Sequence, residues 1–504
     1  MTNSTLRSHR ALGAPAVRWA SVLAAFAIAM QLAACNDRMP LAPAEKQVAN
    51  VPLPPAHSYI VQVGSAGHIP QAVQQAIHDA GGHIVRVQQD LGLALVTGMS
   101  ASAANALRTS GAVGMILPNV RRQYVREVAS QRHVVRLDAA AASRVAAHRL
   151  TALDNVDPRT AHFFGQQWNM VQIAADTAWQ VTTQGQGVTV YILDTGVDTA
   201  HIDLAGKVDG TLSTSFAFAP GDTVDTLPLP FGHDVAGHGT FVSSQIAGNS
   251  LGMAAAAPQS RLVMVRVLDD NGSGDDFAVI SGILYAADHS ASIISVSLGG
   301  YLSRSNSFDL GLYDLMQRAI DYAAARGALI VAAAGNESLN TNTAAAPKGS
   351  YADSLHVIAG GLRHVISVGA TGPVDQKNFD MIAQYSNFGK ADVAVFAPGG
   401  NVVDTTDVGV NDLVFGACSS SSDLVSCPDE NFYVLEAGTS FSAPLVAAEA
   451  AVIMAHATSR PTPAQLESCI LNSADVVKGT SRPDINYNFG RIDVLAGALH
   501  SACK

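Results

Sequence analysis

Residues 190–198 read VYILDTGVD, and this stretch indicates the type of fold. The run from Val188 to Leu193 is short, apolar and rich in β-branched residues, which is typical of a strand buried on both faces of a parallel sheet. Asp194 follows directly, and Gly196 allows the chain to turn away after it. Ligands of such sheets bind at the carboxyl ends of the strands. We therefore expect the Asp194 carboxylate at a ligand-binding edge.

Similar apolar runs recur along the chain and alternate with helical patterns. Further strands are predicted over residues 262–268, 293–298, 328–333 and 365–368. Helices are predicted over residues 238–247, 277–288, 310–325 and 441–456. Strands that alternate with helices need crossover connections. We therefore expect an α/β fold, a three-layer sandwich around a mostly parallel central sheet, within residues 166–504.

A smaller unit is predicted upstream, over residues 58–125. Strands at residues 59–63, 83–87, 91–96 and 113–117 are interrupted by amphipathic helices at residues 69–80 and 101–109. This β-α-β-β-α-β order is that of a small α+β, ferredoxin-like domain. Residues 126–165, with their Arg, Ala and Asp-Pro segments, are predicted to form a linker.

The first 34 residues predict an export signal. Arg7, Arg10 and Arg18 precede an apolar stretch that is too short to span a membrane. The stretch ends Leu-Ala-Ala before Cys35, which resembles a bacterial lipoprotein signal in which Cys35 carries the lipid. The alternative is an ordinary secretory peptide followed by an unrelated cysteine. The polar, proline-bearing residues 35–57 are expected to form a tether.

Composition and cysteine content fit an exported globular chain. Hydrophobic residues make up 48% and charged residues 14%, which is enough to bury a large core. The net charge of −11 disfavours a nucleic-acid partner, and we expect a monomer. Apart from Cys35, four cysteines allow three disulfide pairings. We favour Cys418–Cys427 and Cys469–Cys503 because both are local; free buried thiols are the alternative.

Three further motifs follow predicted strands or open predicted helices. His238 stands in GHGTFV (237–242) at a helix start, between small residues that leave its ring free. Ser440 in GTSFSAP (438–444) starts an apolar helix, whose unpaired N–H groups favour a nearby oxyanion. Asn336 in AGNE (334–337) follows a buried strand. Each motif alone has a plain alternative: a turn-forming Asp or Asn, a surface His, or an N-capping Ser.

Taken together, these motifs resemble those of the subtilisin-like serine peptidases, the subtilases. The matching segments are DTG (194–196), HGT (238–240), AGN (334–336) and GTS (438–440), and the order Asp, His, Ser is that of subtilisin. The rival interpretations are a catalytically inactive binding protein on this fold and a different serine hydrolase. The second would need a Gly-x-Ser-x-Gly motif, which Ser440 lacks, and the opposite chain order.

The resemblance implies roles for the site residues. Asp194 orients His238, and His238 takes the proton of Ser440, which forms an acyl-enzyme with proteins or peptides. The Asn336 side chain and the Ser440 N–H would bind the oxyanion. The residues expected to line the substrate cleft are Ser297, Leu298, Gly299 and Gly300. The chemistry needs no cofactor.

The resemblance also implies regulation and export. The unit at residues 58–125 is similar to the family's inhibitory propeptide, and residues 121–127 would cross the cleft as a substrate does. Self-cleavage in the linker would activate an enzyme that is anchored in the bacterial cell envelope or released outside the cell. Residues 404–435 look like an insertion that could wall the cleft or cover it.

The resemblance to the subtilases also raises the question of a structural calcium ion. Asp203 matches a calcium-ligand position of the family. However, residues 249–257 are shorter and less polar than the family's calcium loop. The alternative is that Asp203 is a plain solvated side chain.

Overall fold

The computed structural model describes residues 53–54, 56–64, 67, 69–125, 133–137, 156–219, 227–303, 305–341, 355–402, 410–423, 425–475 and 489–503. The predicted signal sequence, Cys35, most of the tether and most of the linker lie outside these residues.

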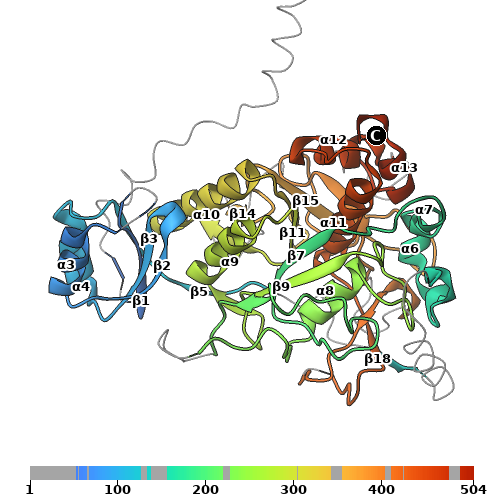
Figure 1. Cartoon of the computed structure of the whole chain (residues 1–504), viewed down its shortest axis with the longest axis horizontal. Coiled ribbons are helices and arrows are strands. Elements are labelled where there is room, and N and C mark those ends of the chain that lie inside the picture. The colour runs from blue at the N-terminus through green and yellow to red at the C-terminus, as the bar shows by residue number, and fades with distance from the viewer. Residues whose placement is uncertain are drawn as a thin grey trace, which may run out of the picture. The chain divides into compact units, whose positions relative to one another are not determined.

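A seven-stranded parallel sheet forms the centre of the large domain (Figure 1). Its strands, in spatial order, are β16 (Val395–Pro398), β15 (Val365–Thr371), β13 (Leu329–Ala333), β11 (Ile293–Val296), β7 (Thr189–Asp194), β9 (Arg261–Arg266) and β8 (Thr214–Ser215). The strand that carries the opening motif therefore lies inside the sheet, between β11 and β9. The predicted parallel central sheet is confirmed.

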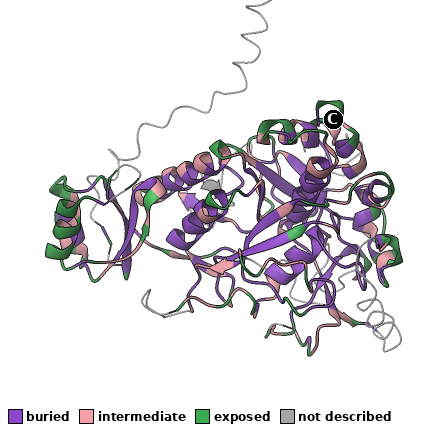
Figure 2. Cartoon of the chain, viewed as in Figure 1, coloured by how far each residue is buried: buried purple, intermediate pink, exposed green. Residues whose placement is uncertain are grey.

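Helices cover both faces of this sheet because successive side chains of its strands point to opposite sides. From β7, Val190 and Ile192 pack with helices α8 (His238–Ile246) and α11 (Thr439–His456). Tyr191 and Leu193 pack with α9 (Asp276–Asp288) and α10 (Ser307–Ala325) on the other side. Three layers result, as the sequence predicts, and the central strands β11 and β13 are buried along their whole length (Figure 2).

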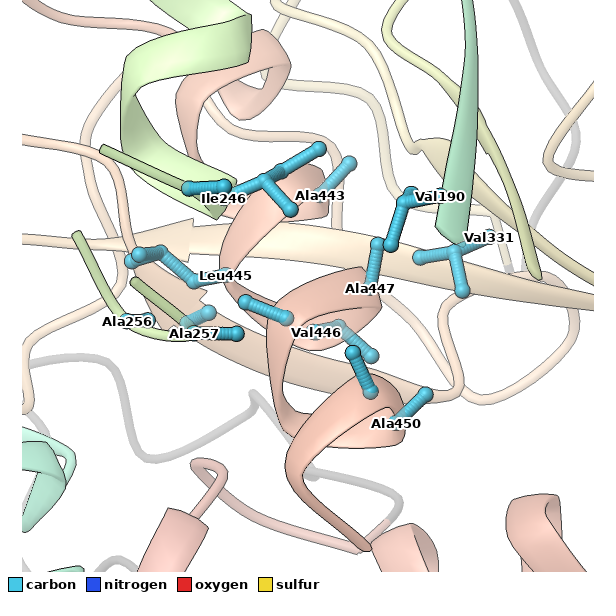
Figure 3. Close-up of a cluster of buried hydrophobic side chains, with 14 of the residues drawn as sticks. Val190, Ile246, Ala256, Ala257, Val331, Ala443, Leu445, Val446, Ala447 and Ala450 are labelled. Atoms are coloured by element: carbon cyan, nitrogen blue, oxygen red, sulfur yellow. The ribbon is translucent and has the colours of Figure 1, made fainter. Parts of the chain in front are cut away.

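Helix α11 is the core helix of the first face. Its small residues Ala443, Ala447 and Ala450 let it lie close to β-strand residues such as Val190 and Val331 (Figure 3). Within the described part of the chain, α11 is also the one helix long and apolar enough to cross a membrane, and 83% of it is buried inside the protein. That burial identifies α11 as a core helix.

The small upstream unit has the predicted order of elements. The elements are β1 (Ser58–Gln62), α3 (Gln71–Asp79), β2 (His83–Gln88), β3 (Leu93–Thr97), α4 (Ala101–Thr109) and β4 (Met115–Pro118). The antiparallel sheet has the order β2-β3-β1-β4, and one face packs on α3 and α4 around Ile77 and Leu107. Ile60 and Leu117, from the opposite face, belong to the core cluster of α9 and α10.

The predicted insertion folds as a hairpin and recruits part of the predicted linker. β17 (Val414–Ala417) pairs with β18 (Phe432–Glu436), and β18 pairs with β6 (His133–Arg136). The linker prediction therefore missed a strand, whose sequence HVVR contains two β-branched residues suited to a sheet edge. The disulfides are those favoured from the sequence, Cys418–Cys427 and Cys469–Cys503.

Short elements that the sequence analysis did not identify complete the described chain. They are β5 (Arg121–Gln123), α6 (Trp168–Gln172), α7 (Ala175–Val181), β10 (Ser273–Asp275), β12 (Gly300–Ser303), β14 (Leu355–Ile358), α12 (Pro463–Ser473) and α13 (Val494–Leu499). β5 pairs antiparallel with β10, and β12 pairs antiparallel with β14. Both pairs lie outside the central sheet.

Candidate active site

Asp194 and His238 meet at the carboxyl end of β7. His238 Nδ1 lies 2.7 Å from Asp194 Oδ1, and the carboxylate is fully buried. Two glycines allow the approach: Gly196 has φ +127°, and a Cβ on Gly239 would lie 2.1 Å from the Gly196 carbonyl oxygen. No larger residue would let the start of α8 lie this close to the turn after β7.

A second buried carboxylate, Asp234, holds this arrangement. It accepts hydrogen bonds from the Thr195 hydroxyl (2.8 Å), the Thr240 hydroxyl (2.6 Å), the Thr240 N–H (2.8 Å) and the Gly237 N–H (3.0 Å). Asp234 thus ties the turn after β7 to the first turn of α8. Sequence analysis missed it because an Asp three residues before a helical Gly-His-Gly looks like an ordinary capping residue.

The electrostatics of the pair favour a protonatable imidazole. Burial by itself would lower the pKa of His238, but the charge and the hydrogen bond of Asp194 outweigh it, so that the pKa is raised above its usual value. The imidazole side chain is only 8% exposed. Its other ring nitrogen, Nε2, is buried and has no hydrogen-bond partner within the described residues. That nitrogen can accept a proton.

Ser440 lies in the first turn of α11, and its hydroxyl makes no hydrogen bond with His238 Nε2 in this structure. Its neighbour Phe441 contacts the His238 ring, with ring centroids 5.7 Å apart. The Ser440 hydroxyl donates to the Ser297 carbonyl oxygen at 3.2 Å, and the Ser297 hydroxyl donates to the Ser440 carbonyl oxygen at 2.8 Å. The hydroxyl thus points at Ser297 here, and hydrogen bonds between catalytic groups commonly tighten only once substrate is bound.

Asn336 is held with its amide group in a defined orientation. Its Oδ1 accepts from the Thr439 N–H at 2.9 Å and from the Thr439 hydroxyl at 2.7 Å. These two bonds direct the oxygen toward α11, so that the NH₂ group is the part that can donate elsewhere. Asn336 and Ser440 line the same pocket, together with Leu298, Gly299 and Gly300. The predicted oxyanion donor and most of the predicted cleft residues are therefore neighbours.

The chain's own upstream segment lies along this cleft. The N–H groups of Tyr124 and Val125 both donate to the Gly272 carbonyl oxygen at 3.1 Å, and the Gly299 N–H donates to the Tyr124 carbonyl oxygen at 3.2 Å. Tyr124 and Val125, which follow β5, are thus held from two sides by backbone hydrogen bonds. Tyr124 lines the same pocket as Asn336 and Ser440.

Asp203 does not fit a calcium site. Its carboxylate is buried and accepts from three backbone N–H groups, those of Leu251, Gly252 and Met253, at 2.6–3.1 Å. The Tyr433 hydroxyl from the insertion hairpin donates to it at 2.6 Å. These hydrogen-bond donors place partial positive charge around the Asp203 carboxylate, where a cation would have to bind. The alternative of a solvated Asp203 is also wrong, because the side chain is buried. Over the described ranges, no group of three or more His, Cys, Asp or Glu could hold a metal ion.

Comparisons with known proteins agree with this geometry. A family model described as "Subtilase family" matches residues 185–491. Thermitase of Thermoactinomyces vulgaris is 32% identical over 326 residues, which cover 64% of this chain and 93% of thermitase. The thermophilic serine proteinase of Bacillus sp. (strain AK1) is 32% identical over 339 residues, 67% of this chain and 68% of that protein.

Among solved structures, the epidermin leader peptide processing serine protease (EpiP) of Staphylococcus aureus has a similar fold. It has a TM-score of 0.68 at 21% identity and covers 88% of this chain and 98% of its own. At this identity the likeness concerns the fold alone. The match to EpiP covers 88% of this chain and the match to thermitase covers 64%, so the similarity in structure extends beyond the region of sequence similarity.

Proposed function

Because this chain belongs to the subtilase family and is thereby a serine endopeptidase, we propose that it cleaves protein substrates with Asp194, His238 and Ser440 as its catalytic triad. The observation that supports this assignment is the 2.7 Å contact between His238 Nδ1 and Asp194 Oδ1. This contact leaves His238 Nε2 available as the base that accepts a proton. Ser440 supplies the hydroxyl from the adjoining helix start.

In the proposed reaction the proton moves from Ser440 to His238 as the serine oxygen attacks the peptide carbonyl. Asp194 fixes the imidazole tautomer and stabilises the imidazolium. The Asn336 NH₂ and the Ser440 N–H donate to the oxyanion. His238 then returns the proton to the leaving amine, and water hydrolyses the acyl-enzyme. In subtilisin itself, loss of such an Asn donor costs on the order of 10²–10³ in rate.

The direct test compares two neighbouring serines of α11. We expect Ser440→Ala, cut to mature length in trans by the natural enzyme and repurified, to show no hydrolysis of casein or of fluorogenic peptides. Ser442→Ala is the matched control, since that buried hydroxyl has no partner in the described structure and the proposal gives it no role. Full activity of Ser440→Ala, or equal loss in both variants, would disprove the assignment.

We also propose that the small unit at residues 58–125 inhibits the enzyme within the precursor. Support comes from the strand β5 and from Tyr124, which occupy the cleft that a substrate would need. Further support comes from the packing of the small sheet against the core of α9 and α10. An inhibitor that binds by backbone hydrogen bonds along the cleft excludes substrates regardless of their sequence.

Export and lipid anchoring are proposed from residues 1–35 alone. The basic start, the short apolar stretch and Cys35 support a lipidated mature N-terminus in the cell envelope. Mass spectrometry of the mature protein tests this proposal. A diacylglycerol-modified Cys35 is the expected result, and an unmodified N-terminus downstream of Cys35 would refute the anchor. The expected monomeric state remains a prediction.

A further inference from the structure

The upstream half of the cleft presents four aspartates to the bound segment. β5 pairs with β10 so that Arg122 lies opposite Gly274 and Arg121 opposite Asp275. The carboxylates within reach of the two arginines come from the β9–α9 region and from α10: Asp269, Asp275, Asp276 and Asp309. These four residues are called the acidic subsite below.

Asp276 is the buried centre of the acidic subsite. It is the first residue of α9 and is only 1% exposed. Arg122 Nε donates to Asp276 Oδ1 at 2.8 Å, and the same guanidinium donates to Asp309 Oδ1 at 3.1 Å. Such charge-assisted hydrogen bonds are stronger than neutral ones.

Tyr124 reaches the same carboxylate from the apolar side. Tyr124 is 4% exposed and belongs to the cluster that contains Leu298 and Leu302, and its hydroxyl donates to Asp276 Oδ1 at 2.7 Å. The subsite therefore offers an apolar slot for an aromatic ring with a hydrogen-bond acceptor at its end. A phenylalanine would fill the slot and leave that acceptor without the hydroxyl.

Arg121 completes the contact on the outer side of the strand. Its guanidinium donates to Asp269 and, at 3.2 Å, to the Phe218 carbonyl oxygen, and it lies 4.0 Å from Asp275. The two adjacent arginines thus bind different pairs of aspartates. The enzyme can therefore distinguish a basic side chain from a neutral one at both positions of the segment.

Asp276 is a buried carboxylate while the segment is bound, and the Arg122 guanidinium supplies its cation. Burial raises the pKa of Asp276 to about 6, although Arg122 and the Tyr124 hydroxyl both lower it. Its second oxygen, Oδ2, is buried and lacks a hydrogen-bond partner within the described residues. An occupant that covers Asp276 without bringing a cation would leave a costly buried carboxylate, so an occupant that brings a guanidinium is favoured over one that does not.

We propose that the acidic subsite makes this peptidase select substrates with basic residues two and three positions before an aromatic hydroxyl residue, as in Arg-Arg-x-Tyr. The inference rests on the proposed function, because it takes the bound segment as a guide to how substrates lie. Backbone contacts at Gly272 and Gly299 accept any sequence, whereas the aspartates discriminate among side chains.

The test uses mature enzyme and three peptides that cover residues 118–132 with a fluorophore and a quencher. One has the natural sequence, one carries Arg121→Gln with Arg122→Gln, and one carries Tyr124→Phe. We expect the double Gln peptide to lose about ten-fold or more in kcat/KM, or in Ki where a peptide inhibits without being cut, since hydrogen bonds to charged groups are lost. The Phe peptide should lose less.

Enzyme variants locate the effect. Asp276→Asn should remove most of the discrimination between the natural and the double Gln peptide. Asp321→Asn is the matched control, an ion-paired aspartate outside the acidic subsite, and should leave the discrimination unchanged. If Asp276→Asn does not mature, the peptide comparison on the natural enzyme still decides. Equal kcat/KM and equal Ki for the natural and double Gln peptides would overturn the inference.

The same assay separates this inference from the proposed function. Mature enzyme that cuts casein and treats all peptides alike refutes only the selectivity. Mature protein that cuts neither casein nor any peptide refutes the proposed function, and the selectivity falls with it.

Discussion

In the proposed mechanism, the Asp194–His238 hydrogen bond sets the pH range in which the enzyme is active. The imidazole must be neutral to accept the Ser440 proton, so protonation of His238 switches the base off. Burial opposes that protonation, yet the Asp194 charge outweighs burial and raises the pKa of His238. The pH at which activity is lost on acidification is therefore shifted upward.

We predict that kcat/KM falls on acidification with a midpoint above 6.5, the ordinary value for histidine. Asp234 contributes a further negative charge that raises the pKa of His238. Asp234→Asn should therefore move the midpoint to lower pH, besides lowering the rate. A pH profile of mature enzyme on a fluorogenic peptide measures both. A natural midpoint at or below 6.5, or an unmoved midpoint in the variant, would contradict this account.

Motifs indicated the proposed reacting groups of the site but not the groups that support them. Asp194 and His238 stand in short glycine-containing segments whose spacing is visible in the sequence. Asp234 and Asp276 have no such surroundings, and an isolated Asp before or at a helix start is usually a cap. Their roles depend on partners such as Thr195 and Arg122, which are distant in sequence. A local pattern cannot show such contacts.

Among the elements, α11 carries a buried acid that the proposed chemistry does not use. Glu449 is fully buried in this helix, and neither of its oxygens has a hydrogen-bond partner in the described part of the chain. Burial, with a smaller effect of Asp493, raises the pKa of Glu449 well above its usual value. The folded protein then binds this proton more tightly than the unfolded chain does.

Stability is therefore lost as the pH rises above the unfolded pKa of Glu449. We predict that Glu449→Gln increases the free energy of unfolding at pH 8 by about 1–3 kcal/mol, the scale of a buried unpaired polar group, with little change at pH 4. Chemical denaturation at the two pH values measures this difference. An equal effect at both values would mean that ionisation of Glu449 is not the cause.

The insertion hairpin, formed by β17 and β18, supplies a hydrogen-bond donor to the core of the large domain. Through β18 it brings the Tyr433 hydroxyl to the buried Asp203, where the resemblance alone suggested a calcium ion. We predict that Tyr433→Phe destabilises the protein by about 1–3 kcal/mol and that added calcium does not restore the loss.

The control for this prediction is Tyr322→Phe, which removes a hydroxyl from exposed Asp288 at the same distance of 2.6 Å. Its cost should be smaller because water replaces the bond. Thermal unfolding with calcium or with EDTA distinguishes the cases. Rescue of Tyr433→Phe by calcium would show that a cation binds at Asp203 after all.

The spacing of apolar residues predicted the long helices and strands, because the sequence of each one specifies which of its faces is buried. The run ending at Leu193 and the helix containing Ala447 needed no distant information. The strand β6 was missed because its partner β18 lies about 300 residues away in sequence and only the folded chain brings them together. The short strands β5 and β10 were missed for the same reason.

At the scale of the whole molecule, we propose a precursor whose first folded unit blocks the active site of the second. The unit shares a core with α9 and α10 and extends Tyr124 into the cleft. We predict that Ser440→Ala accumulates a precursor of full length after export, because the cut depends on the enzyme's own hydroxyl. Immunoblotting of the expressed protein shows this. Normal processing of the variant would mean that another peptidase makes the cut.

The most direct test of the triad is covalent labelling of the mature enzyme with a fluorophosphonate, followed by peptide mapping. We predict one labelled serine, Ser440, and loss of the label in His238→Ala that the natural enzyme has cut to mature length in trans, because the hydroxyl reacts only when the imidazole takes its proton. A label on another serine, or undiminished labelling of Ser440 without His238, would contradict this prediction.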